Sequence, residues 1–426
     1  MNRFFYSLLL YLLLPFTPIK LLWRGIKQVE YLQHWTERYG FFGTQYQQPI
    51  IWLHCVSVGE TRAAAPLIHA LLKQYPQYQI LLTHSTPTGR ETGHQLFGDK
   101  VLRAYLPYDT PCAVQRFLRH FQPKIGLLLE TELWFNLIAT CQHENIPLLL
   151  VNARLSERSA AGYAKLDKLV SHALKTLTWI AAQTVQDAQR LKSLGAPHVE
   201  VFGNLKFDVM PPENYQSLGQ TLRDLLGSHR PIFLAASTRD GEETLILKAI
   251  QNIQTSQIPN LLTVIVPRHP QRFDEVASLL QSQAISYVRR SQIQTMINSD
   301  ISVVLGDSMG EMFTYYAACD FAFIGGSLLD FGGQNLIEPA SVGKPVLIGP
   351  HTFNFNEVTE SAIQAGAAIR INDTLTLSDK IVFLYEHPIE QKKMQEAAIA
   401  FTRSSKGATQ HTLELIERVL IDSKVG

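Results

Sequence analysis

Glu60 is the first residue whose type and position suggest chemistry. It lies in the segment Ser57-Val58-Gly59-Glu60, between an apolar run at 50–56 and a helical pattern at 63–73. Ligands of open parallel sheets bind beyond the carboxyl ends of strands, in front of the helices that follow. Glu60 is therefore expected at a ligand-binding edge. The alternative is an acidic residue in the first turn of a helix, favoured there by the helix dipole.

Other polar residues of the first half also follow apolar runs. They are Arg62, Ser85, Thr86, Thr88, Arg90, Glu130, Glu132, Asn152 and Arg154. Loops that follow parallel strands converge on one edge of a sheet, so these side chains are candidates for one wall of a site. The alternative for the Ser, Thr and Asn residues is helix capping.

Glu130 and Glu132 are harder to explain as caps, because both follow the fully apolar run 125–129. A pair of carboxylates can bind a metal ion, another cation or a basic partner. We favour a structural or orienting ion pair, with Arg154 as the candidate partner. The possible substrate-binding residues are Arg62, Arg90, Arg154, Glu130 and Glu132, together with Ser237 and Arg239 of the second half.

The strand ends of the second half carry groups typical of a site for a phosphorylated ligand. They are Ser237 to Glu243, Pro267 to Pro270, Gly306 to Glu311, Gly325 to Ser327 and Gly332 to Glu338. Glycines allow the backbone to approach a ligand, and free amides at helix N-termini favour anions. Arg239 and Arg268 can add charge-assisted bonds to an anion. Neither G-x-G-x-x-G in a βαβ unit nor a P-loop occurs, and no Asp-x-Asp suggests a metal-held nucleotide.

Apolar runs and helical patterns alternate along most of the chain, which predicts βαβ units on parallel sheets. With 426 residues, the chain is long enough for two domains. We predict four parts, 1–27 as a membrane anchor, 28–210 as an N-terminal domain, 211–230 as a linker and 231–426 as a C-terminal domain with closing helices from 388 to 422. The two domains are expected to face a cleft.

The composition is that of a globular protein, 46% hydrophobic and 18% charged, with a formal net charge of +1. The absence of overall basicity argues against nucleic acid as a partner. The four cysteines are scattered without metal-ligand spacing, so reduced buried thiols are expected.

The N-terminal stretch 4–19 carries no charge and is followed by Lys20, Arg24 and Lys27. As a helix it is about 24 Å long, shorter than a hydrocarbon core of roughly 30 Å. Pro15 and Pro18 bend or end such a helix, so a span and shallow insertion both fit. A cleaved signal peptide fits less well because no small-x-small cleavage site follows. The basic residues place the rest of the chain on the cytoplasmic side.

Several motifs match one family in order along the chain. They are Ser57-Val58-Gly59-Glu60, Thr86-Pro87-Thr88-Gly89, Leu106-Pro107-Tyr108-Asp109, Glu130-Thr131-Glu132-Leu133-Trp134, Asn152-Ala153-Arg154-Leu155-Ser156, Gly325-Gly326-Ser327-Leu328 and 349–355. On these motifs the chain resembles the 3-deoxy-D-manno-octulosonic acid (Kdo) transferases of Gram-negative lipopolysaccharide assembly.

The resemblance implies an α/β fold of the GT-B type, with two Rossmann-like domains and a monotopic attachment to the inner membrane. It implies an inverting glycosyltransferase that moves Kdo from CMP-Kdo to a lipid A precursor (lipid IVA), without a metal or other cofactor. The first domain would bind the acceptor and the second the nucleotide sugar. Glu60 would be the general base. The family's CMP contacts fall on Pro267, Arg268, Met309, Gly310, Glu311, Asn335, Leu336, Ile337 and Glu338.

Some positions depart from the family pattern. Many relatives have His where Arg239 stands, Pro where Phe135 stands, and His-Asn-Pro where Gln334-Asn335-Leu336 stand. Two other functions stay open. One is a GT-B glycosyltransferase that uses a UDP-sugar, which competition by UDP rather than CMP would reveal. The other is a membrane-tethered nucleotide-sugar binding protein without transfer activity.

Overall fold

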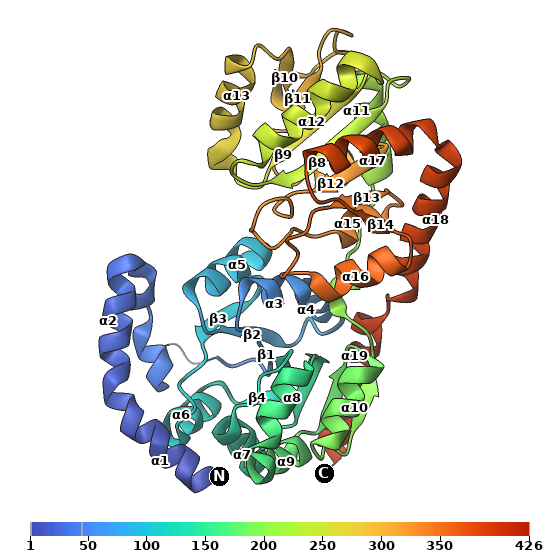
Figure 1. Cartoon of the computed structure of the whole chain (residues 1–426). Helices are drawn as coiled ribbons and strands as arrows, with labels where there is room; N and C mark the ends of the chain where they lie inside the picture. Colours follow the sequence, from blue (N-terminus) through green and yellow to red (C-terminus); the bar gives the residue numbers. More distant parts are fainter. Residues whose placement is uncertain (1, 44–45, 426) are drawn as a thin grey trace. The chain divides into compact units, whose positions relative to one another are not determined.

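The chain forms two compact units, Met1–Asp208 with Ser405–Gly426 and Val209–Ser404. The computed structural model describes residues 2–43 and 46–425 (Figure 1). Each unit contains one parallel sheet of seven strands covered by helices. The predicted fold class, α/β with two parallel-sheet domains, is confirmed.

The sheet of the first unit has the strand order β3-β2-β1-β4-β5-β6-β7. Its strands are β1 (Ile50–His54), β2 (Gln79–His84), β3 (Leu102–Tyr105), β4 (Pro123–Leu129), β5 (Leu148–Ala153), β6 (Trp179–Ala182) and β7 (Val199–Val201). The connections run outward from β1 to β3 and then return to β4 on the other side of β1. The pair β1–β4 is therefore the topological switch point, where ligands of such sheets bind.

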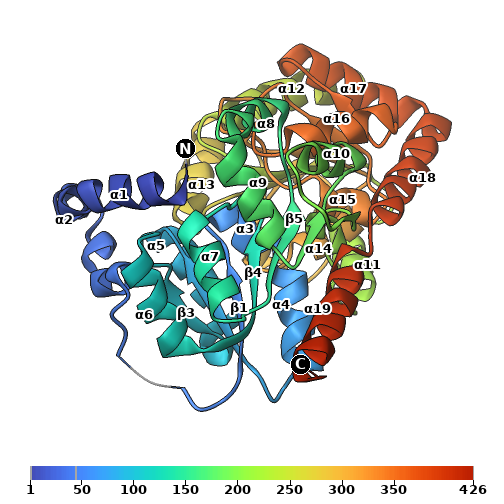
Figure 2. The ribbon, with the colours of Figure 1, turned by 90° about the horizontal axis from the view of Figure 1, so that it is seen from below.

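Both faces of this sheet are buried. The two-residue period of β1 places Ile50 and Trp52 in one apolar cluster and Ile51 and Leu53 in the other. The covering helices are α3 (Val58–Ala63), α4 (Ala65–Gln74), α5 (Pro87–Phe97), α6 (Pro111–Phe121), α7 (Phe135–His143), α8 (Glu157–Ala164), α9 (Asp167–Thr176), α10 (Val185–Ser193) and α19 (Ala408–Val425). Figure 2 shows α19 alongside α4, which it contacts.

The N-terminal segment forms α1 (Arg3–Leu13) and α2 (Thr17–Lys27), joined by a 3-10 turn at Leu14–Phe16. Pro15 lies in that turn and Pro18 in the first turn of α2, so the prolines interrupt the helix as expected. By length and hydropathy Arg3–Lys27 passes as a candidate membrane span, and 6% of its most apolar window is buried, unlike the core helix of a soluble protein. Helix α1 lies against α7 of its own unit (Figure 1).

The sheet of the second unit has the order β10-β11-β9-β8-β12-β13-β14. Its strands are β8 (Ile232–Thr238), β9 (Leu262–Pro267), β10 (Tyr287–Arg289), β11 (Val303–Leu305), β12 (Phe321–Ile324), β13 (Val346–Ile348) and β14 (Ala368–Arg370). Its helices are α11 (Tyr215–Leu226), α12 (Glu242–Ser256), α13 (Phe273–Ser282), α14 (Met312–Ala318), α15 (Ile337–Ser341), α16 (Asn356–Gln364), α17 (Thr374–Glu386) and α18 (Pro388–Ser404). The switch point here is the pair β8–β12.

The structure differs from the predicted segmentation in two places. The segment 211–230 contains helix α11, because Leu222 and Leu226 fall on one helical face and are buried, and Gly219 packs against Ala317. The closing pattern 388–422 forms two helices that separate near Gly407, whose φ of +111° only glycine adopts easily. Helix α19 belongs to the first unit, whereas the predicted C-terminal domain ran to residue 426.

Candidate active site

Glu60 follows β1 and lies in the first turn of α3. Ser57 is the N-cap of this helix, and its Oγ accepts a hydrogen bond from the Glu60 amide at 3.3 Å. The Ser57 hydroxyl donates to Glu60 Oε1 at 3.0 Å, and the Val56 amide donates to Oε2 at 2.7 Å. These bonds fix the carboxylate at the β1 end of the switch point, where Glu60 is 8% exposed.

Burial raises the pKa of Glu60 to about 7, and the nearby charges of Glu130 and Glu132 act in the same direction. The bonds from Val56 and Ser57 lower this pKa but do not outweigh burial. A carboxylate that titrates near neutrality can take up a proton and release it. This is the property that a general base needs.

Glu130 and Glu132 follow β4, the neighbour of β1, so the fold brings both to the edge where Glu60 lies. Glu130 has a φ of +57°, and its amide donates to Val151 O at 3.0 Å. Tyr163 from α8 donates to Thr131 O at 3.2 Å. Burial raises the pKa of Glu132 to about 7, with a further contribution from Glu130. The first unit thus carries a group of three carboxylates at its switch point.

The arginines predicted to bind substrate are placed differently from one another. Arg90 forms an ion pair of 2.6 Å with Glu37 and lies over the ring of Tyr105. Glu37 also accepts from the Tyr105 amide at 2.7 Å, so Arg90 holds the segment after α2 against β3. Arg62 is exposed in the last turn of α3, and Arg154 is half-buried after β5.

In the second unit, Arg268 and Glu338 are brought to the same region from β9 and α15. Burial raises the pKa of the Tyr316 hydroxyl, Glu338 raises it further and Arg268 lowers it, so both charges lie near this tyrosine. Asn335 donates to Glu338 Oε1 at 3.1 Å and accepts from the Ile337 amide at 3.0 Å. Asn335 thereby orients Glu338 at the start of α15.

Three residues predicted to contact the nucleotide have buried side chains. Pro267, Leu336 and Ile337 belong to the interior of the second unit. Leu336 and Ile337 are 0% exposed, backbone included, so their contact with the nucleotide stays a prediction. By contrast, Met309 is 66% exposed, and Gly310 adopts a φ of +80° beside it.

Glu311 follows Gly310 and forms an ion pair of 3.0 Å with Arg290. Burial raises the pKa of the neighbouring Tyr315 hydroxyl well above its usual value, and Glu311 contributes to that rise. The predicted residues 309–311 therefore form a loop that combines an exposed apolar side chain with a paired carboxylate.

The switch point of the second unit is built around Glu242, which we did not single out from the sequence. Its Oε2 accepts from the Gly326 amide at 2.6 Å and the Arg239 amide at 2.8 Å, and its Oε1 accepts from the Leu328 amide at 2.9 Å. The amides of Gly326 and Leu328 are thus occupied by an internal carboxylate. Of the loop Gly325 to Ser327 singled out from the sequence, the Gly326 amide is therefore not free to bind an anion.

Ser237 and Gly325 meet where β8 and β12 end. Ser237 has a φ of +58°, and a Cβ at Gly325 would lie 2.4 Å from the Ser237 carbonyl oxygen. Only glycine fits that approach without a shift of the backbone. Arg239 extends from the same turn, with its guanidinium 3.1 Å from His269 Nε2 and over the ring of Phe331.

Comparison with known proteins identifies the family of this chain. The family described as 3-Deoxy-D-manno-octulosonic-acid transferase (kdotransferase) matches residues 33–209. A 3-deoxy-D-manno-octulosonic acid transferase of Bordetella pertussis is 43% identical over 89% of this chain and 90% of its own length. The chain belongs to the Kdo transferase family. It is a glycosyltransferase.

A second relative extends the similarity over the whole chain. The 3-deoxy-D-manno-octulosonic acid transferase of Haemophilus influenzae is 38% identical over 99% of both chains. Among solved structures, a UDP-GlcNAc 2-epimerase from Neisseria meningitidis covers 87% of this chain and all of its own, with a TM-score of 0.57 and 17% identity. That likeness concerns the fold alone.

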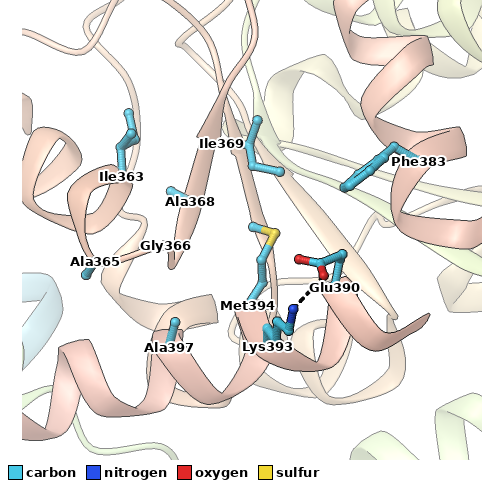
Figure 3. Close-up of a pocket in the computed structure, with 10 residues that line it drawn as sticks. All are labelled: Ile363, Ala365, Gly366, Ala368, Ile369, Phe383, Glu390, Lys393, Met394 and Ala397. Carbon is cyan, nitrogen blue, oxygen red and sulfur yellow. Dashed lines mark hydrogen bonds and ion pairs between the residues drawn. The ribbon is translucent and has the colours of Figure 1, made fainter. Parts of the chain in front are cut away.

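A hollow of about 510 Å³ in this Kdo transferase lies outside the predicted site (Figure 3). It is bounded by α16, β14, α17 and α18, and its lining is mostly apolar. Its charged residues, Glu390 and Lys393, pair with each other at 2.7 Å. None of the predicted site residues lines it, so we assign it no part in the reaction.

Glu242 could have been suspected from the sequence of this family member. It occupies the same place after β8 that Glu60 occupies after β1, namely the first turn of the following helix. Glu37 left no comparable signal, because its partners Arg90 and Tyr105 lie 53 and 68 residues away along the chain. In the described ranges 2–43 and 46–425, no three His, Cys, Asp or Glu side chains are grouped as metal ligands.

Proposed function

We propose that this protein transfers Kdo from CMP-Kdo to a lipid A precursor, lipid IVA, with inversion at the anomeric carbon. The observation that carries the proposal is Glu60, a buried carboxylate with a pKa of about 7 at the switch point of the first sheet. Membership of the Kdo transferase family supports the sugar and the reaction class.

In the proposed reaction a sugar hydroxyl of the acceptor attacks the anomeric carbon of Kdo. Glu60 takes the hydroxyl proton as the new carbon–oxygen bond forms, and the bond to the phosphate oxygen of CMP breaks with its electron pair on CMP. The bonds from Ser57 and Val56 hold the carboxylate in place for this step. Proton removal by a positioned base contributes roughly 10²- to 10⁴-fold to a rate.

The second unit is proposed to bind CMP-Kdo, and the first the acceptor. Arg268 supplies a cation at the end of β9, and Glu338, oriented by Asn335, offers an acceptor for a ribose hydroxyl. Glu130 and Glu132 are proposed to border the acceptor. We propose that no metal ion or other cofactor takes part. Full activity after chelation by EDTA is the expected result, and a loss restored by a divalent cation would overturn it.

We propose that α1 and α2 insert into the cytoplasmic leaflet of the inner membrane and do not span it. Tyr6, Ser7 and Thr17 form hydrogen bonds to the first unit, which turns one face of the segment toward protein. Many large apolar side chains of the segment are exposed, among them Phe4, Phe5, Leu8, Leu9, Leu12, Leu13, Phe16, Ile19, Leu22, Trp23 and Ile26. Exposed apolar residues beside Lys20, Arg24 and Lys27 fit insertion into an anionic lipid surface.

Deletion of residues 1–23 tests this attachment. The truncated protein is expected in the soluble fraction of a lysate, and the full chain with the membranes. Retention of the truncated protein at the wild-type level would show that other surfaces hold it.

The decisive assay is transfer of Kdo from freshly generated CMP-Kdo to a tetraacylated lipid A precursor, with wild type and Glu60→Ala compared. Transfer by wild type and near-total loss in a folded, CMP-binding variant support the proposal. Full activity of the variant would overturn Glu60 as the base. Competition by UDP rather than CMP would indicate a UDP-sugar donor, and binding without turnover would indicate a binding protein.

A further inference from the structure

Asp109 is a buried carboxylate to which the proposed mechanism gives no part. It belongs to the segment Leu106-Pro107-Tyr108-Asp109 between β3 and α6, and it is 4% exposed. Burial raises the pKa of Asp109 to about 6, although the bonds it accepts lower it. A carboxylate in such a place needs several donors to offset the loss of water.

The donors come from the start of α7. Asp109 Oδ2 accepts from the Asn136 amide at 3.0 Å, and Oδ1 accepts from the Leu137 amide at 2.8 Å. Asn136 Nδ2 donates back to the Asp109 carbonyl oxygen at 2.7 Å. Trp134, the N-cap residue of α7, makes no side-chain cap bond. Asp109 therefore caps α7 from another segment of the chain.

Helix α7 begins directly after Glu130-Thr131-Glu132-Leu133-Trp134, the segment that carries two carboxylates of the candidate active site. Because Asp109 fixes the first amides of α7, it fixes one end of that segment. The other end is fixed by β4 and by the bond from the Glu130 amide to Val151 O.

The third donor to Asp109 comes from α1. Tyr6 Oη donates to Asp109 Oδ2 at 2.9 Å, and its ring packs edge-on against Phe135 with centroids 5.1 Å apart. Ser7 donates to Asn136 Oδ1 at 2.9 Å. The apolar N-terminal helix and the segment before α7 thus share one hydrogen-bonded group, Tyr6, Ser7, Asp109 and Asn136.

We propose that Asp109 is a positioning residue that couples the docking of α1 to the placement of the Glu130–Trp134 segment during Kdo transfer. This inference rests on the proposed function, because it takes that segment to be part of the reacting site. In this view α1 attaches the enzyme to a membrane and also completes its active site.

The test compares two substitutions of the same kind on α1 of the full-length protein in detergent micelles. Tyr6→Phe removes the hydroxyl that reaches Asp109 and keeps the ring against Phe135. Tyr11→Phe, the matched control, removes the hydroxyl that bonds Cys112 Sγ at 3.1 Å and leaves Asp109 untouched. Asp109→Asn, which has one acceptor oxygen in place of two, is the stronger variant.

With acceptor dispersed in micelles, kcat is expected to fall about tenfold in Tyr6→Phe and further in Asp109→Asn, because small misplacements of reacting groups are costly. The KM for CMP-Kdo is expected to stay unchanged, and Tyr11→Phe to behave as wild type. Amide hydrogen exchange of residues 135–137 is expected to quicken in Tyr6→Phe and not in Tyr11→Phe.

Equal kcat in Tyr6→Phe, Asp109→Asn and wild type would overturn the coupling, even if exchange quickens. So would equal losses in both Tyr→Phe variants. Absence of Kdo transfer by folded wild type would overturn the proposed function instead. Amide hydrogen exchange of residues 135–137 would then decide the coupling. Quicker exchange in Tyr6→Phe but not in Tyr11→Phe would support it, and unchanged exchange in Tyr6→Phe would overturn it.

Discussion

Glu60 in the first unit and Glu242 in the second both lie in the first turn of the helix that follows the first strand of their sheet. Both are buried, at 8% and 0% exposure, and burial raises the pKa of both. Their partners differ. Glu242 accepts three backbone amides that belong to two loops, whereas Glu60 is held by Val56 and Ser57 of its own turn.

This difference fits a structural role for Glu242 and the proposed role of Glu60 as the base. Glu242 ties the ends of β8 and β12 together, and a protonated side chain there would lose acceptor capacity toward Arg239, Gly326 and Leu328. Glu60 accepts a single backbone amide, from Val56, and the Ser57 hydroxyl. Neighbouring carboxylates raise the pKa of both groups, Glu130 and Glu132 that of Glu60 and Glu243 that of Glu242. The same topological position therefore ties two loops together in one sheet and carries the proposed base in the other.

The largest effect is expected from Glu60→Gln. The amide keeps the shape of the side chain but cannot accept a proton, so kcat should fall roughly 10²- to 10⁴-fold. CMP affinity, measured by calorimetry, should match wild type because the proposed nucleotide contacts lie in the other unit. A variant with kcat within threefold of wild type would contradict the assignment.

Glu242→Gln is expected to destabilise the protein by about 3 kcal/mol, because one amide oxygen replaces two charged acceptors and buried donors lose partners. Chemical denaturation monitored by circular dichroism measures this. Glu338→Gln, at a half-buried position in the same unit, is the control and should change stability much less. Equal losses of stability in Glu242→Gln and Glu338→Gln would contradict the structural role of Glu242.

The pH dependence of stability should reveal the raised pKa of Glu60. The folded pKa of Glu60, about 7, exceeds the usual value of 4.5. Its ionisation therefore costs folding free energy, and this cost appears as pH rises from about 4.5 through 7. Glu60→Gln lacks the cost, so relative to wild type it should gain up to about 3 kcal/mol between pH 4 and pH 8. A pH-independent difference would show that Glu60 is not shifted.

The pH dependence of transfer activity should also report the ionisation of Glu60. Glu60 must be ionised to accept a proton, so kcat/KM of wild type is expected to fall about tenfold per pH unit below pH 7. Ser57→Ala removes a bond that lowers this pKa, so the acid limb of its profile should move to higher pH. An unmoved limb would assign the titration to another group.

The smallest effect concerns Glu37, a carboxylate paired with Arg90 at 2.6 Å. A double-mutant cycle with Glu37→Gln and Arg90→Gln should give a coupling of about 1 kcal/mol in unfolding free energy. Transfer activity of the single variants should fall less than tenfold. If Arg90→Gln instead raises the KM of the acceptor strongly while Glu37→Gln does not, Arg90 binds substrate as first predicted.

The alternation of strands and helices could be predicted from the sequence because it depends on short-range patterns. The strands β1 and β4 could be recognised from continuous apolar runs. Ser57 and Thr86 are the N-caps of α3 and α5, and each bonds an amide three residues further along the chain. The apolar runs 50–56 and 125–129 placed Glu60, Glu130 and Glu132 at strand ends, and the structure shows that these two strands are neighbours. The same reasoning missed α11, whose polar composition hid a single buried stripe of Leu222 and Leu226.

The sequence alone therefore determined the fold class and the order of the elements, since both depend on residues within a few positions of one another. The assignment of Glu60 as candidate base came from the family resemblance and stays a prediction. Tertiary structure decided which groups are free to react. In the folded chain Arg90 pairs with Glu37, and the Gly326 amide donates to Glu242. Tyr6 donates to Asp109, which lies 103 residues further along the chain. The physical reason is that burial and hydrogen-bond partners are set by segments far apart in the chain, and these contacts fix pKa values and available donors.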